Sequence, residues 1–419
     1  MKHASPRHLA ACFAACLATL LPLPGMCADW HVTGSLAEAR RSHTATLLLD
    51  GRVLVVGGYS SARAHIASAE VYDPATGTWS PAGTLAIPRV LHSAALLPDG
   101  RVLVTGGYYR PTPTIWSPTA SAEIYDPNTG SWAMTGSMST ARYWHTATAL
   151  PGGAVLVAGG WGGGWGERSV ATTEELYDSA TGMWQSVGAL NVSRYGHSAN
   201  LLLDGRVLVT GGSEDDEFWS LAVTEIFDPV TRSWSVAPDA PTGILHATTV
   251  TSAGHVVVTG GYSWSPASFT RVDIFEPETM RWTRAPDLAL SRDGHTATLL
   301  SNGDILVAGG QTYLSRLRLA VEPGVEAELF SAETATWSPG GHLNTDRESH
   351  TATLLLDGRV LIVGGTTVSG ALSVSFHPTV LSSAELYGVA GEIEECKNPY
   401  ILTRPCPNPL ARRPRFPGS

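Results

Sequence analysis

The chain has 419 residues, of which 43% are hydrophobic and only 15% charged, and it contains 44 glycines and 13 tryptophans. This balance excludes a disordered chain or a coiled coil and favours an ordered β architecture with tight turns. The formal net charge of −10 argues against a nucleic-acid partner, because phosphate binding needs an excess of Lys and Arg.

Residues 1–28 have the pattern of a secretory signal peptide. Lys2 and Arg7 precede an apolar run over residues 9–23, and small residues lead toward Ala28. We therefore expect an exported protein that is secreted or held in the periplasm or cell envelope. No other segment has the roughly 18 apolar residues that a membrane-spanning helix needs, so no transmembrane span is expected.

A unit built on a Gly-Gly pair recurs seven times along the chain. The pairs begin at Gly57, Gly106, Gly159, Gly211, Gly260, Gly309 and Gly364. A histidine stands fourteen residues before each pair: His43, His92, His145, His197, His246, His295 and His350. Three residues before the histidine, the fifth copy has Gly243 and the other six have an arginine: Arg40, Arg89, Arg142, Arg194, Arg292 and Arg347.

Each unit continues with an acidic residue and, in six copies, a tryptophan nine residues later. The acids are Glu70, Glu123, Glu175, Glu225, Asp273, Glu328 and Glu385, and the tryptophans are Trp79, Trp132, Trp184, Trp234, Trp282 and Trp337. An Asp-Gly turn such as Asp50-Gly51 between two β-rich runs predicts a hairpin. Four short strands per unit at this period are typical of a propeller blade, which buries its faces against neighbouring blades.

The double glycine, the later Tyr, the Trp and the spacing of 49 to 55 residues resemble the kelch repeat. The resemblance covers roughly residues 29–390 and implies an all-β fold, a seven-bladed kelch β-propeller. Galactose oxidase has such a propeller with copper and a cross-linked Tyr-Cys cofactor. This chain has no cysteine between Cys27 and Cys396, so that cofactor cannot form within the ring, and no cofactor is expected. Kelch-type sialic acid mutarotases are a second enzymatic precedent, but they have six blades.

The ends of the repeat array predict how the ring closes. The seventh unit stops at Gly388 without a Trp-containing strand. Trp30 stands ten residues before Arg40, which is the usual offset from Trp to Arg between successive units. The N-terminal segment is therefore expected to supply the fourth strand of the last blade, which leaves no sheet edge open between the blades.

Only one interval of the unit varies strongly, the segment of 11 to 19 residues between the glycine pair and the acid. It joins the second strand to the third, so all the variable loops should lie on one face, as a binding surface on a rigid scaffold requires. We expect ligand-binding aromatic side chains in these loops: Tyr108, Tyr109, Trp116, Trp161, Trp165, Trp219, Tyr262 and Trp264. Flat rings suit a glycan or a peptide. The alternative is that they pack the loops against each other.

Other residues of the units have both a functional and a structural interpretation. Arg89, Arg142 and Arg194 could attract an anion near the mouth of the central channel and are included as candidate ligand-binding residues; alternatively, each arginine pairs with the repeat acid inside the scaffold. The seven histidines are expected to be hydrogen-bonded core residues and not a metal site, because packed sheets lie about 10 Å apart. The acidic run over residues 214–217 could bind a cation or a basic partner, or be solvated.

Residues 391–419 differ from the repeats. Six prolines and five basic residues follow Cys396, with no acid among them. This composition predicts a short, extended C-terminal tail, in which Cys396 and Cys406 form one disulfide. The tail could contact an anionic surface or the acidic body of the protein, or have no role.

Together these features predict an exported, monomeric, non-enzymatic binding module. Its ligand would be a glycan or an extracellular protein bound on the face that carries the variable loops. The alternative is a carbohydrate-active enzyme of mutarotase or lyase type that works near the channel mouth. A propeller fold alone does not decide between them, because propellers host many activities.

Overall fold

A computed structural model describes residues 29–60, 64–112, 115–163, 170–171, 173–214, 220–240, 244–262, 269–314, 319–323, 326–367 and 379–388. Residues Ala28–Gly388 form one compact unit. The predicted signal peptide over residues 1–28 and the tail with Cys396 and Cys406 lie outside the described residues. The described part of the chain contains no helix that is long and apolar enough to cross a membrane.

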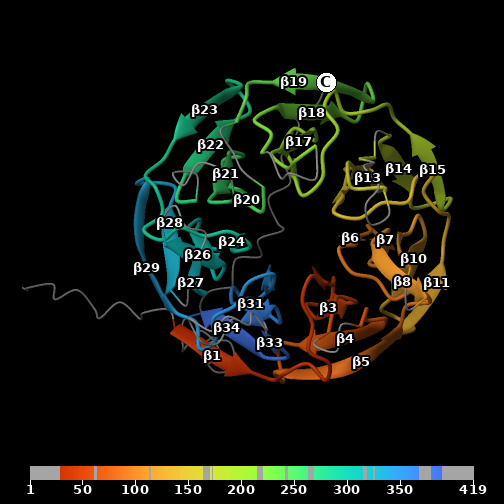
Figure 1. Cartoon of the computed structure of the whole chain (residues 1–419), viewed down its shortest axis with the longest axis horizontal. Coiled ribbons are helices and arrows are strands. Elements are labelled where there is room, and N and C mark those ends of the chain that lie inside the picture. Colours follow the sequence, from red (N-terminus) through yellow and green to blue (C-terminus); the bar gives the residue numbers. More distant parts are fainter. Residues whose placement is uncertain are drawn as a thin grey trace, which may run out of the picture. The chain divides into compact units, whose positions relative to one another are not determined.

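Seven four-stranded antiparallel sheets follow one another around a ring (Figure 1). Blades 1 to 3 comprise β2 (Thr44–Leu47), β3 (Val53–Val56), β4 (Ser68–Asp73) and β5 (Thr78–Thr84); β6 (Ser93–Leu96), β7 (Val102–Thr105), β10 (Ala122–Asp126) and β11 (Ser131–Met134); and β12 (Thr146–Ala149), β13 (Ala154–Ala158), β14 (Glu175–Asp178) and β15 (Met183–Ser186). Blades 4 to 6 comprise β16 (Ser198–Leu201), β17 (Val207–Thr210), β18 (Thr224–Asp228) and β19 (Ser233–Ala237); β20 (Ala247–Val250), β21 (Val256–Thr259), β22 (Val272–Glu276) and β23 (Arg281–Arg284); and β24 (Thr296–Leu299), β25 (Ile305–Ala308), β28 (Glu326–Ser331) and β29 (Thr336–His342).

Blade 7 joins the two ends of the array. It comprises β30 (Thr351–Leu354), β31 (Val360–Val363), β34 (Ala384–Gly388) and, as its fourth strand, β1 (Asp29–Thr33). In the pairing of β1 with β34, Trp30 lies opposite Tyr387, and their ring centroids are 5.0 Å apart. The predicted seven-bladed ring closed by the N-terminal strand is therefore confirmed.

The second strand of each blade is a nearly continuous apolar run and does not alternate between apolar and polar residues. All four residues of β3, β7, β17, β21, β25 and β31 are buried, because neighbouring blades cover both faces of the sheet. One core cluster, for example, joins Val71 of blade 1 to Val104 of blade 2. The core of the propeller is thus a circle of apolar layers between blades.

The recurring tryptophans hold each blade to the one before it. Each Trp lies opposite a Tyr or Phe in the third strand of its own blade, as Trp79 lies opposite Tyr72. The indole N–H then donates to a backbone carbonyl of the preceding blade at 2.7–2.9 Å in six cases: Trp30 to Gly340, Trp79 to Gly34, Trp132 to Ala82, Trp184 to Gly136, Trp282 to Pro238 and Trp337 to Pro286. Each such ring therefore buries apolar area and satisfies its polar edge at a blade boundary.

The recurring histidines make a second set of links between blades, nearer the centre. The Nε2 atom of each histidine forms a hydrogen bond of 2.7–3.0 Å with a hydroxyl of the preceding blade: His43 with Thr351, His92 with Thr44, His145 with Thr105, His197 with Thr146, His246 with Ser198, His295 with Thr259 and His350 with Thr296. This confirms the prediction of hydrogen-bonded core histidines. It also explains the glycine pair, since a Cβ at Gly106 would stand 2.6 Å from the ring of His145.

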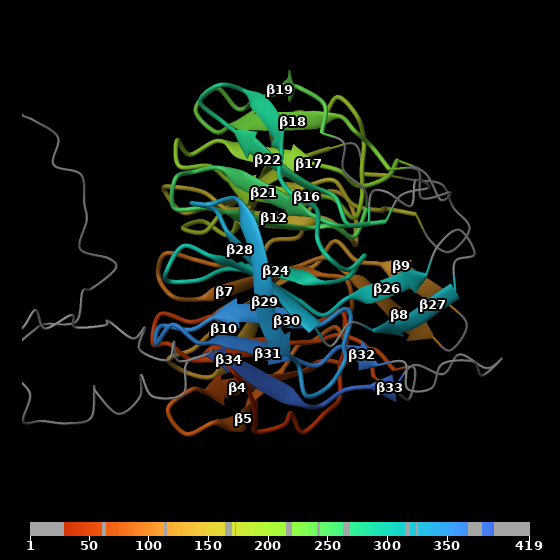
Figure 2. The ribbon, with the colours of Figure 1, turned by 90° about the vertical axis from the view of Figure 1, so that its left-hand side faces the viewer.

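The two faces of the ring differ as predicted. The short turns between the first and second strands and between the third and fourth strands lie on one side, and the longer connections lie on the other (Figure 2). Three of these longer connections contain small ribbons: β8 (Tyr108–Thr112) with β9 (Ile115–Pro118), β26 (Gln311–Leu314) with β27 (Leu319–Pro323), and β32 (Thr366–Thr367) with β33 (Thr379–Val380). We call these sides the turn face and the loop face.

Candidate functional site

The repeat arginines belong to the scaffold and not to an exposed ring. Arg89 is 0% exposed, and its guanidinium donates to the carbonyls of Gly106 (2.7 Å) and Ser121 (3.1 Å) and to Oε1 of Glu123 (2.7 Å). Glu123 in turn accepts the backbone N–H of Ala86 at 2.7 Å. Equivalent arginine–glutamate pairs occupy blades 1, 3, 4, 6 and 7.

This burial corrects one of our predictions. The side chains of Arg89, Arg142 and Arg194 have no exposed area, so the direct ligand contact suggested for them is not available in this structure. The structural alternative holds, because each guanidinium donates its hydrogen bonds to the glycine pair and to the third strand of its blade. Blade 5 solves the same problem differently: Asp273 pairs with Arg271, whose Nε lies 2.6 Å from Oδ2.

The two residues before each repeat histidine connect their blade to the residue after the glycine pair and to the preceding blade. The first of them forms an antiparallel bridge with the residue that follows the glycine pair: Arg41 with Tyr59, Val90 with Tyr108, Tyr143 with Trp161, Tyr195 with Ser213, Ile244 with Tyr262, Asp293 with Gln311 and Glu348 with Thr366. The second is Ser42, Leu91, Trp144, Gly196, Leu245, Gly294 or Ser349. We call these three positions of all seven blades the central rim.

Backbone hydrogen bonds run around the central rim from blade to blade. In blades 1 to 4, 6 and 7 the N–H of the second residue donates to the carbonyl of its equivalent in the preceding blade, as Trp144 does to Leu91 at 3.0 Å. These residues have a positive φ, which reaches 56° at Leu91, Trp144 and Leu245. Bulky side chains are rare in this left-handed region, and such strain persists where the surrounding structure holds it and often marks functional sites. Among the seven residues at this position, Trp144 is the aromatic one.

Aromatic rings form one continuous arc over blades 1 to 4 on the loop face. Successive ring centroids lie 4.7–5.7 Å apart along the order Tyr59, His65, Trp116, Tyr108, Tyr143, Trp144, Tyr195 and Trp161. Arg41 lies over Tyr59 and Arg110 over Trp116, each with its guanidinium carbon 5.2 Å from the ring centroid. We call these eight residues the aromatic arc.

Members of the aromatic arc differ in their exposure. Tyr108, Trp161 and Tyr195 are 7%, 8% and 3% exposed, so their main role is to pack the loops against each other. Tyr59, Trp116, Tyr143 and Trp144 remain partly exposed. Both interpretations of the loop aromatics thus apply, to different residues: the buried rings fix the partly exposed ones, which can contact a ligand.

The central rim becomes polar on the other side, in blades 6 and 7. Oε1 of Glu348 accepts the hydroxyl of Thr366 at 3.1 Å, and Oε2 accepts the side-chain amide of Gln311. Oε2 also lies 3.8 Å from the point where a Cβ on Gly294 would stand, so the carboxylate reaches the neighbouring blade. Burial raises the pKa of the Glu348 carboxyl above its usual value. Asp293, one blade away, is 3% exposed.

The predicted site residues are thus only partly brought together. Tyr108, Trp116 and Trp161 belong to the aromatic arc; Tyr109 and Tyr262 are partly exposed on the loop face, where Tyr262 contacts Phe269 at a centroid distance of 5.6 Å. Trp165, Trp219 and Trp264 lie outside the described residues. Tyr59, Tyr143, Trp144 and Glu348 were not predicted from the sequence. The signal that could have found the last three is variation between the otherwise regular arginine and histidine of each unit.

Within the described ranges, no group of three His, Cys, Asp or Glu side chains could hold a metal ion.

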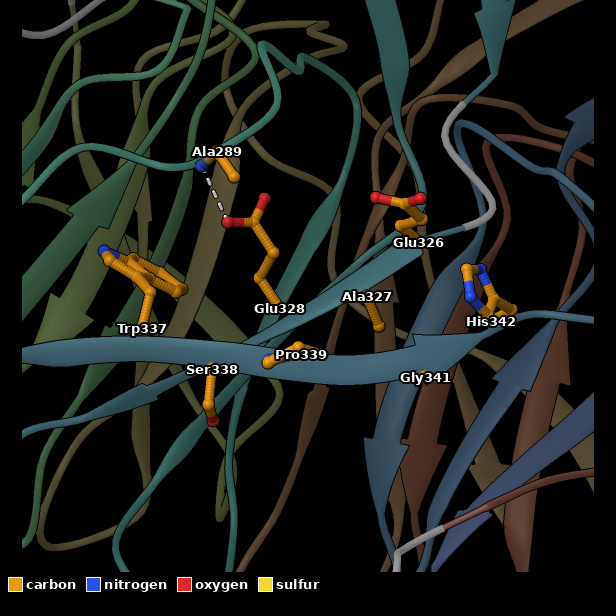
Figure 3. A pocket seen from close by; sticks show the side chains of 9 residues that line it. All are labelled: Ala289, Glu326, Ala327, Glu328, Trp337, Ser338, Pro339, Gly341 and His342. Atoms are coloured by element: carbon orange, nitrogen blue, oxygen red, sulfur yellow. Dashed lines mark hydrogen bonds between the residues drawn. The ribbon is translucent and has the colours of Figure 1, made fainter.

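A pocket of about 360 Å³ lies apart from the central rim, in blade 6 (Figure 3). Glu326 and His342 flank it at the end of the β28–β29 pair, where the register shifts, and Trp337 forms another part of its wall. Glu328 points into it but already accepts the backbone N–H of Ala289 at 2.7 Å and pairs with Arg292. The pocket is thus formed around scaffold contacts, and we do not assign it a ligand.

One buried carboxyl of blade 3 gives a testable prediction. Glu174 is 0% exposed, its Oε2 accepts the N–H of Gly159 at 2.7 Å, and burial raises its pKa to about 7. Since the pKa in the unfolded chain is about 4.5, the folded state loses stability as the pH rises from 4.5 through 7. The free energy of unfolding of Glu174→Gln, relative to that of the native protein, should therefore rise by roughly 2 kcal/mol between pH 5 and pH 8. Urea unfolding at both pH values measures this.

The matched control for that variant is Glu278→Gln, at an exposed position of blade 5. The difference between its free energy of unfolding and that of the native protein should be the same at both pH values. A Glu174→Gln variant whose relative stability does not change with pH would contradict the raised pKa.

Comparison with known proteins agrees with this architecture. The sequence matches the profile of the attractin/LZTR1 β-propeller over residues 28–218 and that of the KLHDC2/KLHL20/DRC7 kelch-repeat domain over residues 145–365, which is more than half of the chain. Kelch-like protein 25 of Xenopus tropicalis is 26% identical over 50% of this chain and 35% of that protein. Kelch-like protein terF of Aspergillus terreus is 29% identical over 29% of this chain and 28% of that protein. The chain thus matches about a third of the length of these relatives.

Solved structures show the same fold. A copper-bound fungal alcohol oxidase of the AA5 family superposes with a TM-score of 0.66 at 19% identity, over 86% of this chain and 76% of that one. YjhT superposes with a TM-score of 0.56 at 14% identity, over 73% of this chain and 98% of that one. At such identities the likeness concerns the fold alone. Taken with the profile match over residues 145–365, the repeat pattern and the seven blades show that this chain belongs to the kelch-repeat β-propeller family.

Proposed function

We propose that this propeller is a binding module that takes a glycan on the loop face, across the central rim. We further propose that it acts outside the cytoplasm, secreted or in the cell envelope, as residues 1–28 predict. The observation that carries the proposal is the aromatic arc, which leaves partly exposed rings on one side of the central rim, with a polar sector on the other side. Membership of the kelch family supports an interaction module, and the glycan of an extracellular protein would be a suitable ligand.

The two sides of the central rim suit different parts of a sugar. Sugar rings have apolar C–H faces and polar hydroxyl edges. Tyr143 and Trp144 offer flat surfaces for the faces, since their own rings are held by contacts to Tyr108 and Tyr195. Glu348 offers a fixed acceptor for hydroxyls, because Thr366 and the neighbouring amide orient its carboxylate. Pre-ordered side chains lower the entropy cost of binding.

Removal of the Trp144 indole tests this proposal. Trp144→Gly is the suitable variant, because Gly196 has this rim position in blade 4 and glycine tolerates the positive φ. Calorimetric titration with a panel of neutral and acidic oligosaccharides should show binding by the native protein and an affinity loss of at least about tenfold in the variant, equivalent to 1.4 kcal/mol. Val230→Gly is the control, because it also removes an exposed apolar side chain but lies in the turn between β18 and β19, on the opposite face.

The outcomes separate the two functional classes. Binding without chemical change, lost in Trp144→Gly and kept in Val230→Gly, supports the module. No binding to any sugar of the panel refutes the glycan ligand. Conversion of a sugar, followed by NMR, would establish the enzymatic alternative in its place.

A further inference from the structure

Five consecutive blades expose an apolar side chain at the same place on the turn face. The position follows the repeat histidine by six residues and precedes the tight turn between the first and second strands. In order from blade 7 to blade 4 it holds Leu356, Leu49, Pro98, Pro151 and Leu203. Leu356, Leu49 and Leu203 are 68%, 66% and 73% exposed. Blades 5 and 6 have Ser252 and Ser301 there. We call the five apolar residues the apolar collar.

Members of the apolar collar are held in place by the neighbouring blade. Each rests on the turn glycine of the next one: a Cβ on Gly51 would meet Cδ1 of Leu356 at 3.0 Å, and a Cβ on Gly100 would meet Cδ1 of Leu49 at 3.1 Å. The same contact joins Pro98 to Gly153, Pro151 to Gly205 and Leu203 to Gly254. The collar is therefore one continuous arc around the ring centre. It lies at the opposite end of the first strands from the central rim.

The turns around the apolar collar are neutral near the collar and acidic farther out. The turns that carry the collar hold close Asp–Arg pairs, such as Asp50 with Arg52 (2.7 Å) and Asp204 with Arg206 (2.7 Å), which are neutral overall. The outer turns, between the third and fourth strands, carry acids that cap backbone N–H groups: Asp73, Asp126, Asp178 and Asp228. The basic side chain beside them in blade 4 is Arg232, which donates to Gln185. The turn face thus has an apolar centre and an acidic periphery.

We propose that the apolar collar is a second interaction surface, which receives a basic polypeptide partner with apolar side chains between its positive charges. Exposed apolar patches within a polar surround commonly mark interaction sites on soluble proteins. The acidic periphery selects a basic partner, since complementary charge steers association and like charge opposes it. It disfavours a second copy of this chain, whose own acids would face those of the first. This surface is independent of the glycan site, because the two lie on opposite faces.

A synthetic peptide of alternating leucine and arginine is the probe. Fluorescence anisotropy with the full chain should show binding that weakens as salt is added. The triple variant Leu49→Ser, Leu203→Ser, Leu356→Ser should lose affinity at least about tenfold. Its melting temperature should stay close to the native value, because these side chains are mostly exposed. Leu245→Ser, an exposed leucine of the central rim, is the control and should bind like the native protein.

Two further arms make the result decisive. A peptide of alternating serine and arginine should bind more weakly and not distinguish the triple variant from the native protein. Sedimentation velocity should show the same oligomeric state for the native protein and the triple variant. The proposal is overturned if the leucine–arginine peptide binds the triple variant as tightly as the native protein, if Leu245→Ser weakens it equally, or if the collar proves to be a dimer interface.

Discussion

Replacement of Arg89 by methionine should destabilise the propeller by about 3–5 kcal/mol, because it leaves Glu123 as an unpaired carboxylate in a dry site. The native guanidinium also satisfies the carbonyls of Gly106 and Ser121, which would lose their donor. Arg89→Lys should recover little of the loss, since a single ammonium cannot reach the same fork of acceptors. Urea unfolding followed by tryptophan fluorescence measures both variants.

The same blade contains a matched control for this prediction. Arg101 pairs with Asp99 at 2.6 Å, but its side chain is 35% exposed. Arg101→Met should therefore cost less than about 1 kcal/mol. Equal losses for Arg89→Met and Arg101→Met would mean that the buried pair is not a structural element of the blade.

Acidification should unfold the propeller steeply. Burial lowers the pKa of six repeat histidines, to about 3 for His92, His197 and His350, whereas the unfolded value is 6.5. The unfolded chain therefore binds more protons than the folded one between pH 6.5 and about 3, and stability falls as the pH drops through this window. Each such histidine contributes about 1.4 kcal/mol per pH unit. Several act together, so the melting temperature should drop sharply below pH 6.

A single variant tests whether the histidines cause this dependence. His92→Gln keeps a donor for Thr44 but removes one titrating group. The slope of its free energy of unfolding against pH should correspond to about one proton fewer than that of the native protein. His342→Gln, at an exposed position of blade 6, should leave the slope unchanged. A native slope that is flat between pH 6.5 and 4, or a slope unaffected by His92→Gln, would contradict the assignment.

The repeat pattern was enough to predict the fold because each recurring residue has one structural duty. The Trp offset of the first unit predicted the β1–β34 pairing. The invariant spacing of histidine and glycine within a unit reflects close packing, since a Cβ on Gly107 would stand 2.9 Å from the Cβ of His92. Arg89 shows the limit of the same logic. Its recurrence indicated a scaffold role more strongly than a ligand contact, and its complete burial settles the choice.

The candidate site was harder to predict, because aromatic composition does not reveal exposure. Tyr108 and Trp116 stack at 5.7 Å, yet only Trp116 is partly exposed, and this depends on packing between loops of different length. Trp144 escaped notice because it stands inside the regular part of the unit and not in a variable loop. Its place next to Leu91 and Gly196 of the neighbouring blades follows only from the arrangement of the blades in a ring.

We propose that the ligand lies on the central rim, over the partly exposed rings of the aromatic arc. Hydrogen–deuterium exchange with and without the tightest-binding oligosaccharide tests it most directly. Exchange should slow in the backbone around Tyr59, Trp144 and Glu348 and stay unchanged in the turns of the opposite face. Protection confined to those turns or to the outer strands, with none at Trp144, would contradict the account.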